Sequence, residues 1–83
     1  MVVTVKLFAF LGRYLPPAAQ GNEASISVDE GSTVGEVLDR VGVPAEHRHL
    51  VLVDGVYVPP QQRSVQPVSA GQVIAVWPMV AGG

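Results

Sequence analysis

Hydrophobic and polar positions alternate along residues 2–10 and again along residues 24–28. A period of two is typical of a strand with one buried face. The first of these strands places Val3, Val5 and Leu7 on its buried face. Between the two strands, the Pro16-Pro17 pair lacks the backbone donors that a sheet requires, so we expect residues 11–23 to form a loop outside the sheet.

The hydrophobic period changes to that of a helix after Thr33. Four aliphatic residues then follow at positions i, i+3, i+4 and i+7, and a helix brings such positions to one face. They are Val34, Val37, Leu38 and Val41. Thr33 and Glu36 match a capping box, in which the hydroxyl and the carboxylate each satisfy a backbone donor of the first turn. Gly42 is placed to end the helix in a left-handed conformation.

Two more strands are predicted on either side of Asp54-Gly55, over residues 50–53 and 56–58. An Asp-Gly pair favours the two-residue turn that joins the strands of a hairpin. The last strand, residues 73–77, is apolar at every position. We therefore expect it to be central in the sheet and buried on both faces, with its pairing ended by Pro78.

This order of elements predicts an α+β fold, with a mixed sheet of four to five strands and one main helix packed on one face. We expect residues 1–78 to form a single domain. Residues 79–83 are expected to form a flexible tail, because terminal residues are usually disordered unless tied down. Most of the aromatic residues are expected to pack in the core; they include Phe8, Phe10, Tyr57 and Trp77.

Composition removes several classes of function. With 83 residues, 48% of them hydrophobic, the chain fits one small globular domain. The chain has no cysteine, so any sulfur chemistry must use sulfur that a partner supplies. A net charge of −2 with scattered basic residues offers no basic stripe for nucleic acid. No apolar run approaches a membrane span and no export signal is evident, so we expect a cytoplasmic protein without membrane partners.

The segment Val80-Ala81-Gly82-Gly83 carries the strongest functional signal. Glycine lacks a Cβ, so Gly82 and Gly83 can enter a channel too narrow for other side chains. With Gly83 as the last residue, an ATP-dependent partner can convert its carboxylate to an acyl-adenylate, which a thiolate or persulfide sulfur can attack. The alternative is a frayed end without a function.

Apolar residues near the last strand are candidates for a partner surface. Met79 lies beyond that strand, where its own core cannot easily bury it, and methionine is common on adaptable binding surfaces. Together with Tyr57, Val58 and parts of Leu52, it can form a docking patch. Ordinary exposure is the alternative, because single exposed apolar residues need no explanation.

Two polar pairs have simpler explanations than metal binding or catalysis. His47 and His49 would share one face of a strand and could begin a metal site, but no third ligand is evident in the sequence. We expect a solvated loop there and no metal. Glu36 and Asp39 are explained by capping and by a wet helix face, whereas acid–base catalysis needs a shaped site that shifts pKa values.

Taken together, these motifs resemble the ThiS/MoaD family of sulfur-carrier proteins, which have the ubiquitin-like β-grasp fold. The resemblance spans nearly the whole chain, and the final segment is its most specific part. The residues that carry it are Val5-Lys6-Leu7-Phe8-Ala9, Gly31-Ser32-Thr33-Val34-Gly35-Glu36-Val37-Leu38, Val53-Asp54-Gly55, Gly71 and Val80-Ala81-Gly82-Gly83.

The resemblance implies a protein substrate rather than an enzyme. An adenylyltransferase of the ubiquitin-activating type, similar to MoeB or ThiF, would use ATP to adenylate Gly83, and sulfur transfer would give a C-terminal thiocarboxylate. Val80, Ala81 and Gly82 would enter the partner's active site. The receiving partner would be the large subunit of molybdopterin synthase or another sulfur acceptor, and no cofactor would be bound.

Three alternatives stay open at this point. The length of the loop over residues 11–23 is more like the molybdopterin synthase small subunit than a thiamine carrier. Molybdopterin synthesis therefore comes first and thiamine synthesis next. However, Trp77-Pro78-Met79 stands where many small subunits have a Pro-Pro pair, which leaves the choice of pathway open. The same activated Gly83 could instead be joined to lysines of other proteins by a ubiquitin-like modifier. The third alternative is a β-grasp binding module.

Overall fold

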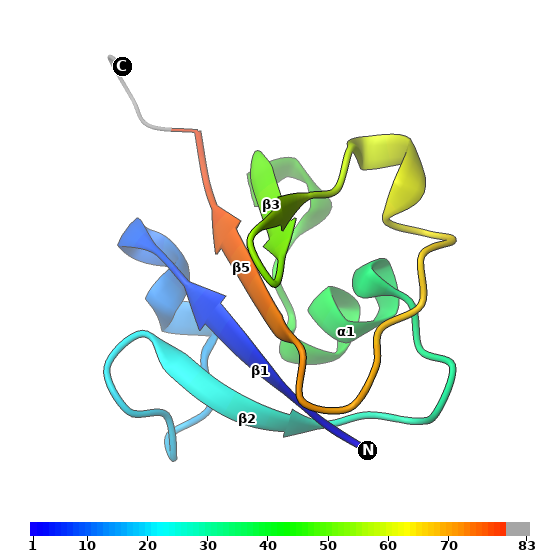
Figure 1. Ribbon diagram of the computed structural model, residues 1–83. Coiled ribbons are helices and arrows are strands. Elements are labelled where there is room, and N and C mark those ends of the chain that lie inside the picture. The colour runs from blue at the N-terminus through cyan, green and yellow to red at the C-terminus, as the bar shows by residue number, and fades with distance from the viewer. Residues whose placement is uncertain (80–83) are drawn as a thin grey trace.

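The two strands nearest the ends of the chain lie side by side in the centre of one five-stranded sheet (Figure 1). The computed structural model describes residues 1–79. The strands are β1 Val2–Leu7, β2 Glu23–Ser27, β3 Leu50–Val53, β4 Val56–Tyr57 and β5 Val73–Trp77. The helices are α1 Val34–Val41 and three 3-10 turns, η1 Ala9–Tyr14, η2 Ala45–His47 and η3 Pro60–Gln62.

The sheet has the strand order β2-β1-β5-β3-β4. β1 and β5 are parallel, with Thr4 opposite Val73 and Leu7 opposite Val76. All other neighbouring strands are antiparallel. The predicted mixed sheet and the central place of the last strand are therefore confirmed.

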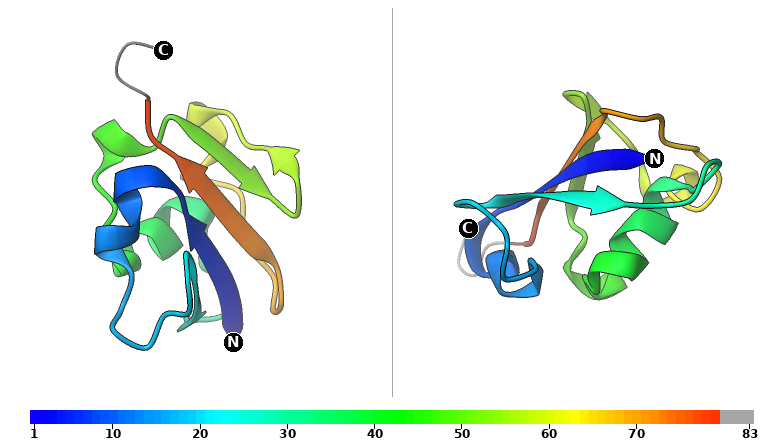
Figure 2. Two further views of the ribbon diagram at one scale, coloured as in Figure 1. Left: turned by 90° about the vertical axis from the view of Figure 1, so that its left-hand side faces the viewer. Right: turned by 90° about the horizontal axis from the view of Figure 1, so that it is seen from below.

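One helix covers one face of this sheet (Figure 2). The buried side chains of β1, β3 and β5 point toward α1, and together they form the core. The largest side chains that are fully buried include Leu7, Leu11, Leu38, Ile74, Val3, Val5, Val34, Val37, Val51 and Val76. Among the described residues, no helix is long and apolar enough to cross a membrane.

The prediction that β5 is buried on both faces is wrong. Ile74 and Val76 are completely buried, whereas Val73, Ala75 and Trp77 are only half-buried. These three side chains point to the face that α1 does not cover. The continuous apolar run therefore identified the central strand correctly, but it did not indicate that one face of the strand is more exposed than the other.

Both ends of α1 form as the sequence predicts. The Glu36 amide donates to the Thr33 hydroxyl at 3.2 Å, and the Thr33 amide donates to the Glu36 carboxylate at 2.9 Å. Gly42 ends the helix with a φ of 100°, which favours glycine because it has no Cβ to clash. The capping pattern therefore predicted both ends of α1 correctly.

The turn between β3 and β4 is the predicted hairpin turn. Asp54 and Gly55 both have positive φ angles, 49° and 83°, as the two-residue turn that matches strand twist requires. The Asp54 carboxylate also accepts a hydrogen bond from the Val73 amide at 2.9 Å. This contact ties the hairpin to the start of β5.

The first strand is shorter than predicted. β1 ends at Leu7 rather than at residue 10, and the chain turns into η1 through Ala9, which has a φ of 54°. Leu11 in η1 is fully buried. The expected loop outside the sheet thus begins as a 3-10 helix that places one leucine in the core.

A buried arginine holds together the segments that follow α1. Arg63 is 8% exposed, and its guanidinium donates to the backbone carbonyls of Val58 at 3.0 Å, Arg48 at 2.6 Å and His49 at 3.5 Å. Burial, which disfavours a charged form, lowers the pKa of Arg63 from its usual value. Arginine nevertheless stays protonated in proteins, so a cation bonded to carbonyls fixes the start of β3.

Replacing Arg63 with methionine should lower the free energy of unfolding by about 2–3 kcal/mol, because hydrogen bonds to charged groups are strong and the carbonyls would lose their donor. The matched control is Arg40→Met, at an exposed arginine of α1, for which we expect a change within about 0.5 kcal/mol. Urea denaturation measures both. Equal stability of the two variants would contradict the assigned role of Arg63.

Candidate functional site

β5 is fixed in the sheet up to a buried proline. The carbonyl of Trp77 accepts a hydrogen bond from the His49 amide at 3.1 Å. Pro78, which has no donor to extend the pairing, is buried, and Met79 is 68% exposed. The chain therefore changes from buried to exposed between residues 78 and 79, at the upper end of β5 in Figure 1.

Val80, Ala81, Gly82 and Gly83 lie outside the described residues. Their predicted entry into a partner's active site, the predicted chemistry of Gly83 and the predicted flexible tail over residues 79–83 therefore stay predictions. What the structure provides is the point at which the chain leaves the sheet.

An aromatic pair covers the end of β5. The rings of Phe8 and Trp77 stack with their centroids 4.1 Å apart and their planes 8° apart. The Phe8 amide donates to the Val76 carbonyl at 3.1 Å, so the chain after β1 stays beside β5. The stacked rings thus reinforce the last residue of the strand from the side opposite α1.

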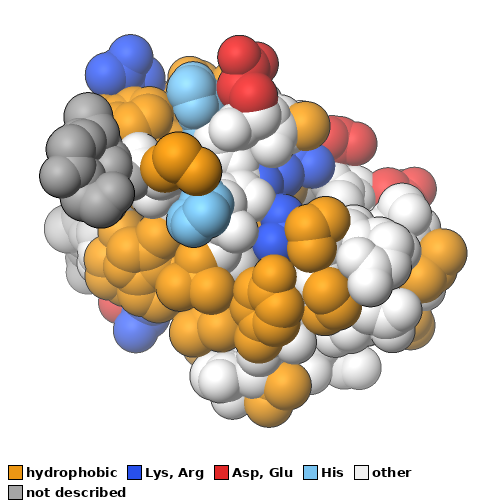
Figure 3. All heavy atoms as spheres, turned by 90° about the horizontal axis from the view of Figure 1, so that it is seen from above, with side chains coloured by type: hydrophobic (Ala, Val, Ile, Leu, Met, Phe, Trp, Pro, Cys, Tyr) orange, Lys and Arg blue, Asp and Glu red, His pale blue; other side chains and the backbone are white. Residues whose placement is uncertain are grey.

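Polar and aromatic side chains of η1 and η2 meet nearby. The rings of Phe10 and His47 make an edge-to-face contact with their centroids 5.1 Å apart. The Arg13 guanidinium lies 5.1 Å from the Phe10 ring centroid and donates to the Phe10 carbonyl at 3.2 Å. Figure 3 views this end of the molecule and shows both histidines among hydrophobic side chains.

The face of the sheet without a helix is apolar near the end of β5. Strand pairing puts Tyr57, Leu52 and Ala75 in one row and Leu50 and Trp77 in the next, and residues two apart on a strand share a face. We call this set the open-face patch; with Phe8 it consists of Phe8, Leu50, Leu52, Tyr57, Ala75 and Trp77. All are half-buried except Tyr57, which is 52% exposed.

The structure changes the membership of the predicted docking patch. Tyr57 and Met79 are exposed, at 52% and 68%, and Leu52 is half-buried. Val58 is 1% exposed and belongs to the core. Its inclusion is therefore corrected: it follows Tyr57 directly, so its side chain points to the opposite face, toward the core.

The sequence did not identify Phe8 and Trp77 as surface residues, because aromatic residues usually pack in a core. None of the four aromatic residues assigned there is completely buried, and Phe10 is 41% exposed. The number of helices is the sequence signal that could have identified these surface residues. One helix of eight residues covers only one face of the sheet, so the other face of an apolar central strand stays open.

The expected solvated loop at the two histidines is only partly correct: His47 ends the 3-10 turn η2 and contacts Phe10, whereas His49 is exposed. Within residues 1–79, no three side chains from His, Asp and Glu gather as a metal site would require. Glu36 caps α1, and Asp39 accepts from Arg48 at 2.6 Å. Both carboxylates are therefore engaged in structural contacts.

Replacing Phe8 with alanine should shift the fluorescence emission of Trp77 to longer wavelength, because removing the stacked ring exposes the indole to water. The chain has one tryptophan, so the signal has a single source. An aromatic pair contributes about 0.5–1.5 kcal/mol beyond burial, and unfolding should be easier by at least that amount. Phe10→Ala is the control, since Phe10 contacts His47 instead; an equal shift in both variants would refute the assigned stacking.

Comparisons with known folds agree with this architecture. The crystal structure of SAMP1 from Haloferax volcanii matches with a TM-score of 0.71 and 24% identity over all of both chains. The solution structure of the Haloferax volcanii HVO 2177 protein matches with a TM-score of 0.70 and 25% identity, over all of this chain and 87% of the other. A comparison with curated protein sequences found no match.

A third fold is described as a molybdopterin converting factor, subunit 1, from Pyrococcus furiosus. It matches with a TM-score of 0.68 and 24% identity, over 95% of this chain and 98% of the other. These neighbours confirm the predicted ubiquitin-like β-grasp fold. The family model described as Mut7-C ubiquitin matches residues 1–82, and with these folds it confirms the resemblance to a ThiS/MoaD-type ubiquitin-like protein. The chain therefore belongs to the Mut7-C ubiquitin family.

Proposed function

We propose that this protein is a sulfur carrier, whose Gly83 carboxylate is adenylated and converted to a thiocarboxylate that donates sulfur in cofactor biosynthesis. Molybdopterin synthesis is the first candidate pathway and thiamine synthesis the second. The observation that carries the proposal is the path of β5: a central strand, paired on both sides, leads through buried Pro78 to the sequence Val80-Ala81-Gly82-Gly83.

The proposed chemistry uses the carboxylate of Gly83 and a partner's sulfur. The carboxylate attacks the α-phosphate of ATP in the activating enzyme, which forms the acyl-adenylate and releases pyrophosphate. A persulfide sulfur of a partner then attacks the acyl carbon, and AMP leaves. A thiol cleaves the resulting acyl disulfide and becomes oxidised, which leaves the thiocarboxylate on Gly83. The domain has no cysteine, so the sulfur must come from a partner.

The open-face patch and Met79 supply a surface for the activating enzyme and the sulfur acceptor. The patch lies on the strands beside β5, and its exposed part includes an aromatic residue, Tyr57. Interface cores are enriched in aromatic residues and methionine. A partner bound here would cover the apolar face and receive the residues that follow Met79. The proposed partners are an adenylyltransferase of the ubiquitin-activating type and the large subunit of molybdopterin synthase or another acceptor.

The second candidate function is covalent modification of other proteins. It is favoured by the fold shared with SAMP1, since another matched structure from the same organism is described as small archaeal modifier protein 1. Both functions begin with adenylation of Gly83 and differ in the attacking group: a sulfur nucleophile for the carrier and a lysine amine for the modifier. The products therefore distinguish them.

The experiment that tests the proposal is the intact mass of the natural protein after incubation with host extract, ATP and a sulfur source. A sulfur carrier gains the mass that corresponds to exchange of one oxygen for sulfur. Deletion of Gly82 and Gly83 should abolish the gain, while the free energy of unfolding changes by less than about 0.5 kcal/mol. Heavier protein conjugates without that gain would favour the modifier, and neither product in an active extract would refute both.

Replacing Tyr57 with alanine should lower the rate of ATP-dependent activation by about fivefold to thirtyfold, as expected for a central interface residue worth about 1–2 kcal/mol. Unfolding is measured in parallel, because Tyr57 is half exposed but also interacts with the Arg63 guanidinium. Val56→Ala is the matched control: Val56 is 68% exposed on the same strand, and its side chain points to the other side. Equal rates for both variants would remove the open-face patch from the docking surface.

A further inference from the structure

In the part of the chain that the structure describes, the outer edge of β2 carries a row of backbone groups without backbone partners. Met1 and Val28 exchange two hydrogen bonds across β1 and β2, which fixes the pattern of the ladder. In an antiparallel pair, every second residue bonds to the neighbouring strand. The amide and carbonyl groups of Ser25 and Ser27 therefore point away from β1, and within residues 1–79 no backbone partner meets them.

Beyond Glu23 at its start, β2 lacks the devices that usually prevent strand addition. Natural edges are blocked by charged side chains, prolines, bulges or very short strands. β2 is five residues long, its middle is Ala24-Ser25-Ile26, and the loop folds back only at its start, where Gln20 and Glu23 exchange hydrogen bonds of 2.9 and 3.2 Å. The opposite edge of the sheet, β4, has two residues. β2 is thus the longer free edge.

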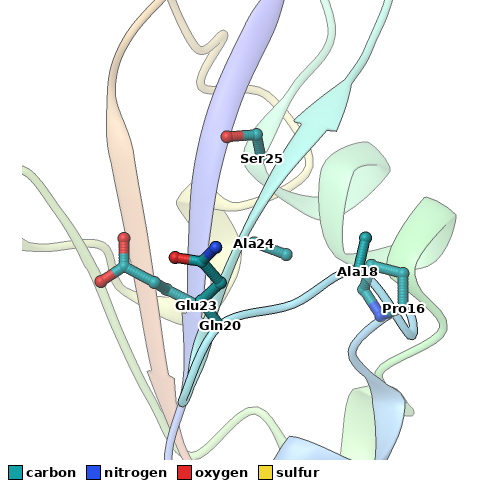
Figure 4. A pocket seen from close by; sticks show the side chains of 6 residues that line it. All are labelled: Pro16, Ala18, Gln20, Glu23, Ala24 and Ser25. Carbon is teal, nitrogen blue, oxygen red and sulfur yellow. The ribbon is translucent and has the colours of Figure 1, made fainter.

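Two shallow hollows flank the unpaired groups. The first lies between β2 and the loop after η1, and Figure 4 shows the Ala24 side chain pointing across it toward Pro16 and Ala18. The second continues toward α1 and is lined by Tyr14, Ile26 and Val41 among others. Ser25 and Pro16 border both hollows, so they form one groove along the edge.

The helix side of this groove has an apolar part and one cation. Arg40, in the last turn of α1, lines the second hollow beside Ile26 and Ser27. Its side chain is exposed, and in the described part of the chain it takes part in no ion pair. A ligand strand would therefore place apolar side chains against Tyr14 and Ile26, and an acidic side chain against Arg40.

We propose that the β2 edge binds an extended peptide segment of a partner protein as a sixth strand. Backbone hydrogen bonds to Ser25 and Ser27 would give affinity, and alternate side chains would give specificity. The segment carries apolar residues at two alternate positions and an acidic residue at the third, next to Arg40. This inference is independent of the chemistry proposed for Gly83.

A second copy of this chain fits the edge less well. In a symmetric pairing of two β2 strands, the nearest acidic side chain would be Glu23, which lies on the open face near Lys6 at 4.0 Å. Arg40 lies on the helix side of the sheet. Self-pairing would leave this cation without its complement, whereas a peptide can place an acid on that side.

The test uses capped peptides with the core sequences Val-Thr-Leu-Thr-Asp and Asp-Thr-Leu-Thr-Val, which cover both strand directions. The two apolar positions are varied over Val, Ile, Leu and Phe. Binding is measured by titration of the isotopically labelled protein, following its amide resonances. We expect the largest changes over residues 24–28, and binding should be lost in Ser25→Pro but kept in Ser25→Ala, because proline removes the donor and is tolerated on edge strands.

The proposed contact between Arg40 and an acidic residue of the peptide is tested separately. Arg40→Glu should weaken the binding of the acidic peptides about fivefold, as expected for the loss of an exposed ion pair of about 1 kcal/mol. The same variant should strengthen the binding of peptides in which lysine replaces aspartate. Arg13→Glu makes the same change in net charge outside the groove and should have no such effect. Absence of binding by every peptide at millimolar concentration, equal binding by a folded Ser25→Pro variant, or shifts confined to the open-face patch would overturn the proposal. Shifts of β2 that depend on protein concentration alone would overturn it in favour of self-pairing.

Discussion

The parallel pairing of β1 with β5 is the constraint on which the rest of the structure depends. It joins the two ends of the described chain, and every other strand is added to one side of this pair or the other. Because β5 has a neighbour on each side, its last residue is held by hydrogen bonds and by the stack of Phe8 on Trp77. Pro78 then ends the strand at a defined place. The point at which the chain leaves the sheet is therefore fixed relative to the open-face patch.

The use of one helix explains both the core and the exposed surfaces. α1 covers the inner face of the sheet through a stripe of aliphatic residues, and the segments after it are held by the guanidinium of Arg63 bonded to backbone carbonyls. Since no second helix lies on the outer face in residues 1–79, the apolar positions of β3 and β5 there stay accessible. The two proposed interaction surfaces are thus different parts of one sheet: the outer face near β5 and the outer edge of β2.

Sequence reasoning predicted the elements well where local chemistry determines them. The capping box at Thr33, the left-handed Gly42 and the Asp54-Gly55 turn formed as predicted, because neighbouring residues decide each of these features. It failed where a decision depends on distant contacts. Whether Val58 faces the core or the surface depends on the register of β4, and the exposure of Trp77 depends on what covers the sheet. The groove beside β2 was not predictable at all, since residues from η1, β2 and α1 form it together.

The place of β5 also affects how the protein is made. The central pair joins strands from opposite ends of the chain, and folds dominated by such distant pairings form more slowly than helical ones. During synthesis, β1 and β3 lack their shared neighbour until β5 has left the ribosome. The complete sheet cannot form before then. A chain broken before residue 73 would expose both strands and be prone to degradation or aggregation. The central parallel pair therefore forms only after nearly all of the described chain has been synthesised.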